Sequence, residues 1–187
     1  HEFNENTTKL MPKSVYGKSK LHNEEYAQSI YMKQNMNMIG LRFFSVYGPW
    51  GRPDMAYYIF TERLKNKKPI KIFNNGLMYR DMTYIDDIID GVISSVDYLT
   101  KNNDSYSHEI FNFGNNKPIS TKELLNEIKE NLNISKNIPV KNVNSLNESF
   151  YTHASIEKAQ RVLGYNPQVN FKTGIVKFLE WHEKYTK

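Results

Sequence analysis

The hydrophobic pattern of the chain switches repeatedly between two spacings. In some segments apolar residues recur every three or four positions, as on one face of a helix, and in others they alternate or form short runs, as in strands. The first spacing predicts helices over residues 15–34, 54–65, 86–99, 121–131, 155–167 and 171–187. The second predicts strands over residues 38–46, 69–73, 79–84, 109–114 and 137–143. Such alternation is typical of an α/β protein.

Local signals mark several helix ends. Ser120 and Glu123 have the spacing of a capping box, in which each side chain binds the backbone N–H of the other residue. Gly164 and Pro167 close the short helix predicted within residues 155–167, Gly164 in the position where a left-handed residue ends a helix. Asp54 precedes another helical pattern, and we expect its carboxylate to act as the N-cap.

The helix predicted over residues 86–99 has the clearest apolar face. Asp86 and Asp87 stand at its beginning, where carboxylates cap a helix and offset its dipole. Paired carboxylates also suit acid–base catalysis, but this position favours the structural role. The apolar positions at helical spacing are Ile88, Ile89, Val92, Ile93, Val96 and Leu99.

The composition indicates a globular protein. With 187 residues, 39% of them hydrophobic and 13% aromatic, the chain can bury a core and fits one domain or a large piece of one. No apolar run is long enough to span a membrane and the first residues lack a signal-peptide layout, so we expect a cytoplasmic protein. Cysteine is absent, which excludes disulfides and cysteine-based zinc sites, and the histidines show no metal-ligand spacing.

The charge of the chain favours small anionic ligands over nucleic acid. The net charge is +5, but the cations are scattered and no basic run with interleaved aromatic residues occurs. Such an excess also attracts small polyanions such as a nucleotide diphosphate. Of the 25 cationic residues, 20 are lysine, so the few arginines are candidates for sites that need a planar, bidentate donor.

The segment "SVYGKSK" places Tyr16 and Lys20 four residues apart, on one face of the predicted helix. A tyrosine is a weak base at neutral pH, and a neighbouring ammonium favours its phenolate. Such a pair can remove a proton from a substrate hydroxyl and return it. Taken alone, the spacing is also common by chance, and an ordinary half-buried tyrosine is the simpler interpretation.

The segment "SVYGPWGRPDMA" predicts an anion site. Its glycines and prolines impose an unusual backbone path, and Arg52 precedes the start of a predicted helix. A guanidinium and a helix N-terminus then meet beyond the end of a strand, where ligands bind in open α/β sheets. The alternative is that Trp50 and the prolines serve packing and that Arg52 is a solvated loop residue.

The segment "IKIFNNGLMYRDMTYIDDI" brings together Phe73 and Arg80. An aromatic face beside an arginine suits a nucleotide base and its phosphates. The competing interpretation is a structural ion pair of Arg80 with Asp81 or Asp86, with Phe73 in the core. No G-x-G-x-x-G, P-loop or G-x-S-x-G sequence is present.

Taken in order, five segments resemble the extended short-chain dehydrogenase/reductases that act on nucleotide sugars, and the likeness is greatest to UDP-glucuronate 4-epimerases. They are "PKSVYGKSKLHNEEYA", "LRFFSVYGPWGRPDMA", "IFNNGLMYRDMTYIDDIIDGV", "FNFGNNKPIS" and "LGYNP". The resemblance implies NAD as cofactor, a UDP-sugar substrate and epimerisation through transient oxidation at C4 of the sugar. It also implies the C-terminal part of a Rossmann-like doubly wound sheet and a small, mostly helical substrate-binding domain.

The resemblance also implies roles for single residues. Tyr16 would be the catalytic base, and Lys20 its partner in holding the nicotinamide ribose. Ser45 and Arg52 would bind the uronate carboxylate, with Ser45 replacing the more usual threonine. The substrate-binding set is completed by Met55 and Ala56 in the same motif, by Phe73 beside the uracil and by Arg80 at the diphosphate.

Three departures from the family pattern shape the expected organisation. The glycine-rich cofactor half and the catalytic Ser/Thr before Y-x-x-x-K are not in the sequence, so we expect a C-terminal portion that is inactive by itself. Residues 1–50 and about 80–115 would form the Rossmann part, and about 51–79 and 116–187 the substrate-binding part. The family's G-D-V-x-x-T-x-A-D sequence is replaced by "NESFYTHAS", which bears on the distal nucleotide contacts.

Two alternatives stay open at this stage. Within the same enzyme class, the chain would be another nucleotide-sugar epimerase, dehydratase or decarboxylase. Outside it, the chain would be a non-catalytic UDP-sugar-binding paralogue. The helix that carries Tyr16 and Lys20 often forms the dimer interface in this family, which is consistent with a homodimer.

Overall fold

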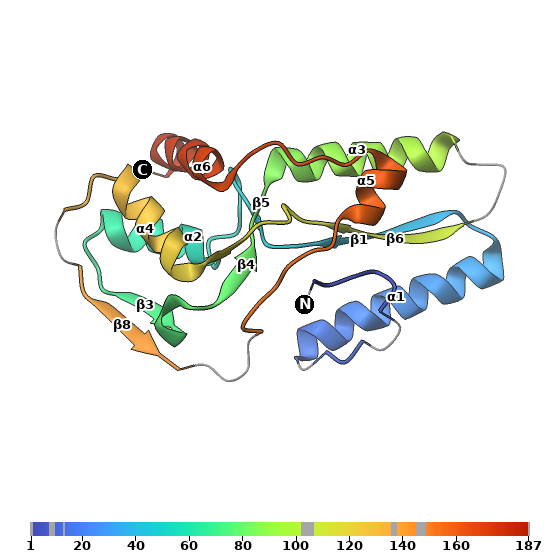
Figure 1. Ribbon diagram of the computed structural model, residues 1–187, viewed down its shortest axis with the longest axis horizontal. Coiled ribbons are helices and arrows are strands. Elements are labelled where there is room, and N and C mark those ends of the chain that lie inside the picture. The colour runs from blue at the N-terminus through green and yellow to red at the C-terminus, as the bar shows by residue number, and fades with distance from the viewer. Residues whose placement is uncertain are drawn as a thin grey trace.

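The computed structural model describes residues 2–7, 10–12, 14–101, 107–135, 138–144 and 149–186. It confirms the α/β pattern, and Figure 1 shows two connected parts, one around α1, α3, α5, β1 and β6 and the other around α2, α4, α6, β3 and β8. The helices are α1 (Val15–Gln34), α2 (Ala56–Lys65), α3 (Ile85–Lys101), α4 (Thr121–Asn131), α5 (Glu157–Leu163) and α6 (Phe171–Tyr185), with a 3-10 turn, η1, at Asn74–Gly76. The strands are β1 (Met38–Phe43), β2 (Val46–Tyr47), β3 (Ile70–Phe73), β4 (Tyr79–Asp81), β5 (Thr83–Tyr84), β6 (His108–Phe113), β7 (Pro118–Ser120) and β8 (Val140–Val143).

The strand predicted over residues 38–46 is divided in two by a change of partner. β1 runs parallel to β6 in the register Met38↔His108 to Phe43↔Phe113. At Ser45 the backbone carbonyl instead accepts a hydrogen bond from Thr83 N–H at 3.0 Å, and β2 then pairs in parallel with β5. The apolar run "MIGLRFFSV" predicts a buried strand, but the side chains of β1 are half-buried or exposed.

Two further strand pairs build the second part. β3 runs parallel to β8, and β4 runs antiparallel to β7. The capping box opens α4 as predicted: Glu123 N–H donates to the Ser120 hydroxyl at 3.1 Å, and Ser120 N–H donates to the Glu123 carboxylate at 2.6 Å. These bonds hold the pKa of Glu123 below its ordinary value. The beginning of α4 is therefore fixed beside β4.

The buried apolar residues form two clusters. The larger one joins α2, α4 and α6 around β3 and contains Tyr57, Phe60, Leu124 and Phe178 among others. The second lies between α3, β6 and α5 and contains Ile88, Phe111, Phe113, Ala154, Ile156, Ala159 and Tyr165. Residues 154–165 thus pack on the β1–β6 side, although the division expected from the sequence groups them with the substrate-binding part. That two-part division stays a prediction.

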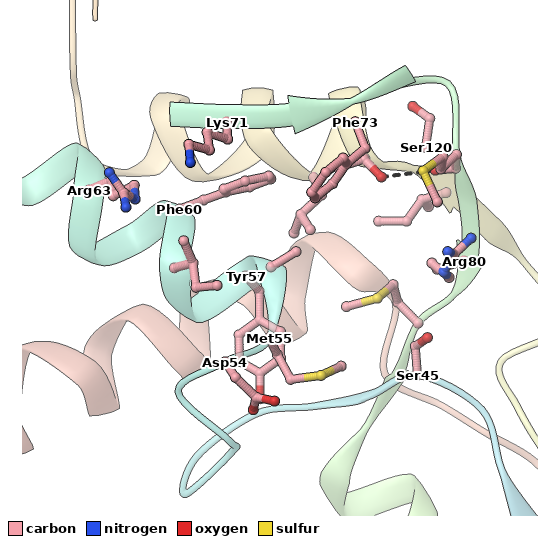
Figure 2. A pocket seen from close by; sticks show the side chains of 17 residues that line it. Ser45, Asp54, Met55, Tyr57, Phe60, Arg63, Lys71, Phe73, Arg80 and Ser120 are labelled. Atoms are coloured by element: carbon pink, nitrogen blue, oxygen red, sulfur yellow. Dashed lines mark hydrogen bonds between the residues drawn. The ribbon is translucent and has the colours of Figure 1, made fainter. Parts of the chain in front are cut away.

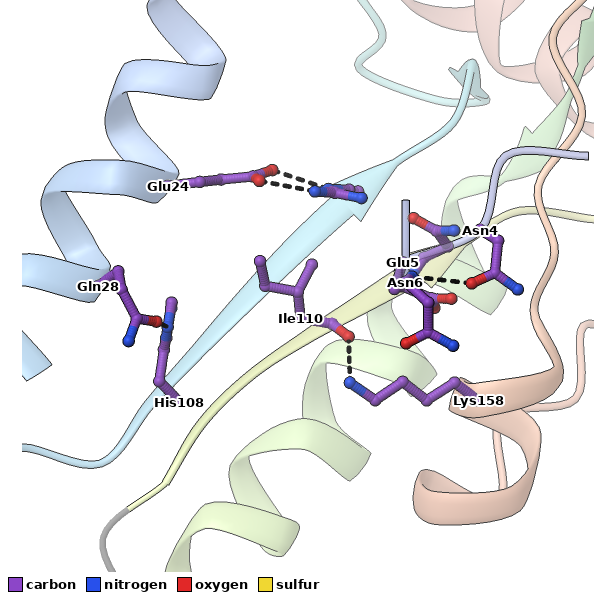
Figure 3. Close-up of polar contacts among 10 residues, drawn as sticks. Asn4, Glu5, Asn6, Glu24, Gln28, His108, Ile110 and Lys158 are labelled. Carbon is purple, nitrogen blue, oxygen red and sulfur yellow. Dashed lines mark hydrogen bonds and ion pairs between the residues drawn. The ribbon is translucent and has the colours of Figure 1, made fainter. Parts of the chain in front are cut away.

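Polar contacts attach α1 to the strands. None of its described side chains is buried. Arg42 of β1 donates to both carboxylate oxygens of Glu24, at 2.8 and 2.7 Å, and His108 of β6 lies 2.5 Å from Gln28, as Figure 3 shows. On β6, the Ile110 carbonyl accepts a bond from Lys158 of α5 at 2.9 Å. The Arg42–Glu24 and His108–Gln28 contacts set the position of α1 and of the residues along it.

The helix predicted over 86–99 is confirmed as α3, but its apolar face is only partly covered. Ile88 is 3% exposed, whereas Ile89, Ile93 and Val96 are about half exposed in the described structure. Gly164 ends α5 at φ +68°, as the sequence predicts. No helix in the described ranges combines the length and apolar character that crossing a membrane requires. The predictions for Asn137, Asn147, Glu148 and Lys187 fall outside the described residues.

Two buried aspartates bind backbone N–H groups of distant segments. Asp81, with 0% exposure, accepts bonds from Asn115 at 2.8 Å, Asn116 at 3.2 Å and Ala154 at 3.0 Å. Asp87 similarly binds the N–H groups of residues 168 and 169, at 2.8 and 3.0 Å. Asp81 therefore joins β4 to the chain that follows β6 and to the segment that precedes α5. The structure does not show the alternative ion pair of Arg80 with Asp81: the described Asp81 carboxylate accepts from backbone N–H groups, and Arg80 donates to the Tyr79 and Ser149 carbonyls.

A buried histidine ties α6 to α2. His182 Nδ1 lies 3.3 Å from Lys65 Nζ, and its Nε2 lies 2.7 Å from a carboxylate oxygen of Glu62. Because an ammonium can only donate, Nδ1 accepts, and the proton of the neutral ring is then on Nε2, which lies near the Glu62 carboxylate without hydrogen-bond geometry. Burial and the Lys65 charge lower the pKa of His182, which favours the neutral ring. The contact thus joins the helices without a buried imidazolium.

We predict that Asp81→Asn destabilises the chain by about 2–4 kcal/mol, because an amide cannot accept three backbone bonds and its NH₂ group opposes the donors. Urea unfolding followed by circular dichroism measures the change. Asp97→Asn, at an exposed position of α3, serves as the control and should shift stability by about 0.5 kcal/mol or less. Equal unfolding midpoints for the two variants would contradict the role assigned to Asp81.

Candidate functional site

A cavity of about 490 Å³ lies between α2, β3, β4 and the beginning of α4. Figure 2 shows its side chains converging from these elements and from Ser45, which follows β1. The change of strand partner at Ser45 brings this residue to the cavity wall. The apolar part of the wall is formed by Met55, Ala56, Tyr57, Ile59, Phe60, Phe73, Met78, Met82, Ile119 and Leu124.

Cationic side chains stand at both ends of this apolar slot. Figure 2 shows Lys71 and Arg63 at one end and Arg80 near Ser45 at the other, with Phe73 between them. Lys71 and Phe73 point the same way because β3 alternates buried and exposed positions. Sequence reasoning missed Lys71 and Arg63. The alternation in "IKIF" places Lys71 beside Phe73, but nothing local to the sequence indicates Arg63.

Arg80 is held by backbone acceptors of neighbouring segments. Its guanidinium donates to the Tyr79 carbonyl at 2.9 Å and to the Ser149 carbonyl at 2.8 Å. The next residue, Asp81, is fixed in the core by its three N–H donors. Arg80 is therefore presented to the cavity from an anchored strand. Phe73, expected in the core under the competing interpretation, lines the cavity and is 40% exposed.

Arg52 lies outside the cavity lining, whereas Asp54 is part of it. The Arg52 Nε and Nη2 groups donate to the two carboxylate oxygens of Asp54, at 3.0 and 2.5 Å. This pair raises the pKa of Arg52 and lowers that of Asp54. The predicted N-cap role of Asp54 is wrong: Met55 occupies that position without a side-chain cap bond, because the Asp54 carboxylate is engaged by Arg52.

The loop that carries Arg52 rests on aromatic residues. Gly48 has φ +139° and Trp50 has φ +61°, a left-handed conformation that is costly for a bulky side chain. The Trp50 ring lies 5.2 Å from that of Trp181 and 5.3 Å from that of Tyr185, both on α6. These ring contacts hold the loop in its strained path.

Tyr57 of α2 packs against the same loop. Its side chain is 1% exposed, and its burial, together with the charge of Asp54, raises its pKa to about 12. A Cβ atom at Gly51 would lie only 1.7 Å from the Tyr57 hydroxyl. Glycine is therefore required at position 51 for the loop to approach α2 this closely.

Tyr16 and Lys20 share one face of α1, as predicted. The Lys20 ammonium lies 5.2 Å from the centre of the Tyr16 ring. Both side chains are exposed and neither lines the cavity described above. The catalytic roles of this pair stay a prediction.

Together these features suit an elongated anionic ligand. An apolar slot with an aromatic face accommodates a planar ring, and arginines bind phosphate or carboxylate oxygens through paired N–H donors. Ser45 adds a hydroxyl at the Arg80 end. No group of three or more metal-ligating side chains occurs among the residues that the structure describes.

Residues 1–114 match the model of the NAD dependent epimerase/dehydratase family. The chain belongs to this family. The match includes α1 and the Arg52 loop, and it continues through β3, β4 and β6. It confirms the resemblance found in the sequence motifs.

Known relatives extend the likeness along the chain. UDP-glucuronate 4-epimerase 4 of Arabidopsis thaliana is 36% identical over 193 residues, which cover 98% of this chain and 44% of the relative. Protein CapI of Staphylococcus aureus is 33% identical over 190 residues, which cover 94% of this chain and 56% of that protein. The chain therefore spans about half the length of these relatives.

Solved structures show the same fold. UDP-glucuronic acid 4-epimerase from Bacillus cereus, in complex with UDP-glucuronic acid and NAD, superposes with a TM-score of 0.89 at 28% identity, over 98% of this chain and 57% of that chain. UDP-glucose 4-epimerase from Thermotoga maritima, in a structure with UDP-glucose, superposes with a TM-score of 0.80 at 25% identity. The match covers 92% of this chain and 54% of that chain. These matches and the parallel strand pairs confirm the Rossmann-like fold class.

We predict that Gly51→Ala destabilises the chain by about 1–3 kcal/mol, because the new methyl group overlaps the Tyr57 hydroxyl. Removing that hydroxyl in the double variant Gly51→Ala/Tyr57→Phe should restore part of the loss. Urea unfolding of both single variants, the double variant and the wild type forms a double-mutant cycle. If the changes in unfolding free energy of the two single variants add up to that of the double variant, the contact between Gly51 and the Tyr57 hydroxyl does not constrain the loop.

Proposed function

We propose that this chain provides the sugar-nucleotide site of an NAD-dependent 4-epimerase of UDP-uronic acids, interconverting UDP-glucuronate and UDP-galacturonate. The observation that carries the proposal is the cavity in which Phe73, Arg80 and Ser45 converge beside the Arg52 loop. The names of several relatives, among them UDP-glucuronate 4-epimerase 4 of Arabidopsis thaliana, support the same activity.

The cavity suits the parts of a UDP-uronate in order along its length. The uracil would stack on Phe73 within the apolar slot. The diphosphate would bind Arg80, whose guanidinium is already oriented by two backbone carbonyls. The sugar would then lie towards Ser45, Met55 and the Arg52 loop. This order places the reacting sugar at the side of the cavity that Ser45, Asp54 and Met55 line, next to the Arg52 loop.

Tyr16 and Lys20 fit a cofactor and a proton-transfer step. Their side chains are exposed on one face of α1, and the Lys20 ammonium can donate to ribose hydroxyls while it stabilises negative charge on the phenol oxygen. Tyr16 would take the proton from the C4 hydroxyl and later return it. NAD, when bound, supplies the hydride acceptor and donor at C4. The sequence holds no G-x-G-x-x-G, so these are the residues the chain offers to NAD.

The uronate preference rests on Arg52. A guanidinium binds a carboxylate through two parallel N–H bonds, and Arg52 makes this type of contact with Asp54. In the proposed complex the Arg52 side chain turns to the sugar carboxylate, and the Ser45 hydroxyl donates to the same group. A homodimer is also part of the proposal, since α1 exposes Tyr26 and Met32 on its surface.

One observation favours a second candidate within the same class. Arg52 stands outside the cavity lining in the described structure, and the cavity wall itself is apolar around Met55 and Met82. A neutral UDP-sugar would fit this arrangement without any movement of Arg52. The similarity to the Thermotoga maritima UDP-glucose 4-epimerase supports the same alternative.

Calorimetric titration with UDP-glucuronate, UDP-glucose and UDP tests the proposal. We expect the uronate to bind more tightly than glucose, and Arg52→Ala to weaken uronate binding by about tenfold or more while changing UDP binding by about twofold or less, because only the uronate carries the carboxylate. Arg161→Ala, at an exposed position of α5, removes the same charge and should leave all three affinities unchanged. Equal losses for all ligands in Arg52→Ala would count against the carboxylate role.

Catalysis is tested at Tyr16. In a preparation that interconverts the two uronates with NAD, Tyr16→Phe should lower turnover by about a hundredfold or more while UDP-glucuronate affinity is kept, because the phenyl ring cannot exchange a proton. Product formation is followed by NMR, with Tyr26→Phe on the same helix as the control. Turnover within tenfold of wild type would remove Tyr16 as the base. Binding without turnover in every preparation would instead favour a non-catalytic UDP-sugar-binding protein.

A further inference from the structure

The Arg52–Asp54 pair has the geometry of a guanidinium bound to a substrate carboxylate. The Asp54 carboxylate accepts from Nε and Nη2 of Arg52, so it occupies one full edge of the guanidinium. Both side chains are largely exposed, at 69% for Arg52 and 62% for Asp54. The pair therefore forms at a surface that a ligand can reach.

The positions of the two side chains relative to the cavity differ. Asp54 belongs to the cavity lining and Arg52 does not. Figure 2 shows Asp54 beside Met55 and Tyr57, on the wall that the sugar reaches in the proposed complex. A negative charge thus faces the cavity where the uronate carboxylate is proposed to bind. This charge repels a uronate and leaves a neutral sugar unaffected.

Release of Asp54 from Arg52 requires little rearrangement of the fold. Met55, and not Asp54, occupies the N-cap position of α2, so the helix does not depend on the Asp54 side chain. An ion pair between two exposed residues is weak and exchanges readily. The two residues before Arg52 are also held in place, Trp50 against Trp181 of α6 and Gly51 against Tyr57. A change of partner at Arg52 can therefore occur by side-chain rotation alone.

We propose that Asp54 is an internal competitor for Arg52, a carboxylate that a UDP-uronate must displace from the guanidinium and that thereby tunes selectivity between uronates and neutral sugars. The inference rests on the proposed function. It adds a specificity-determining residue whose effect is opposite in sign to that of Arg52. Asp54 lowers the affinity for uronates, and it leaves the affinity for UDP itself unchanged because its effect is confined to the sugar end of the cavity.

Calorimetric titration of Asp54→Asn with UDP-glucuronate, UDP-glucose and UDP tests whether Asp54 lowers the affinity for uronates. We expect uronate binding to tighten by about threefold or more, the scale of an exposed ion pair, with the other two ligands within about twofold of wild type. Asp54→Ala should change the three affinities in the same way as Asp54→Asn, which would show that the effect does not come from the new amide group. Asp90→Asn, an exposed aspartate on α3, makes the same change in net charge and should leave all three affinities unchanged.

The ionisation of Asp54 provides a second measurement. Its pKa lies below the ordinary value because Arg52 donates to the carboxylate. If the uronate takes Arg52 away, the pKa of Asp54 rises towards or above that value, because the favourable partner is lost and a like charge arrives. Carbon-13 NMR of the labelled carboxyl follows this titration. UDP-glucuronate should raise the pKa of Asp54, whereas UDP-glucose and UDP should leave it low.

The outcomes separate the inference from the proposed function. Weaker or unchanged uronate binding in Asp54→Asn, with a wild type that prefers uronates, would overturn the inference alone and make Asp54 a support or a bystander of Arg52. An Asp54 pKa that stays low with UDP-glucuronate bound would also overturn it, since Arg52 would then hold both carboxylates. A wild type that binds none of the three ligands would overturn the proposed function, and the inference with it.

Discussion

The Asp81 carboxylate is the contact on which the arrangement of the site depends. It is inaccessible to solvent and accepts bonds from three backbone N–H groups in two distant segments. A buried carboxylate is tolerated only when its oxygens are satisfied in this way. Because Asp81 ends β4, these bonds also fix the strand that presents Arg80, and they join the end of β6 to the chain before α5. Asp81 is thus one of the described residues through which the two parts of the fold are joined, as Asp87 is another.

Each of the two parts is stabilised by a different kind of contact. Around the cavity, α2, α4 and α6 pack through a continuous apolar core, which gives the wall a fixed shape. On the other side, α1 buries none of its described side chains and is positioned by the Glu24–Arg42 and Gln28–His108 contacts. Such contacts are directional, so they orient the face that carries Tyr16 and Lys20 more than they stabilise the helix.

What the sequence predicts well is what short-range chemistry decides. The bounds of α1, the capping box of Ser120 and the Gly164 end of α5 follow from residues within one turn of each other. Predictions of this kind fail where a distant residue competes for the backbone hydrogen bonds. The end of β1 depends on Thr83, about forty residues further along the chain. The site shows the same division: Phe73 and Arg80 are found by motif, whereas the meeting of Arg63 with Lys71 exists only in the folded chain.

The strained Trp50 has a consequence for how this protein can be observed. The chain contains two tryptophans, and Trp50 on the arginine loop lies against Trp181 on α6. Indole emission depends on the polarity and the quenching groups around each ring, so the natural fluorescence of the chain reports the docking of this loop. A loop that lifts from α6 separates the two rings and uncovers Trp181, whereas Trp50 is already 76% exposed, and the loss of the ring contact changes the spectrum. The protein thus carries its own optical probe beside the site, and ligand-linked loop motion can be timed without a label.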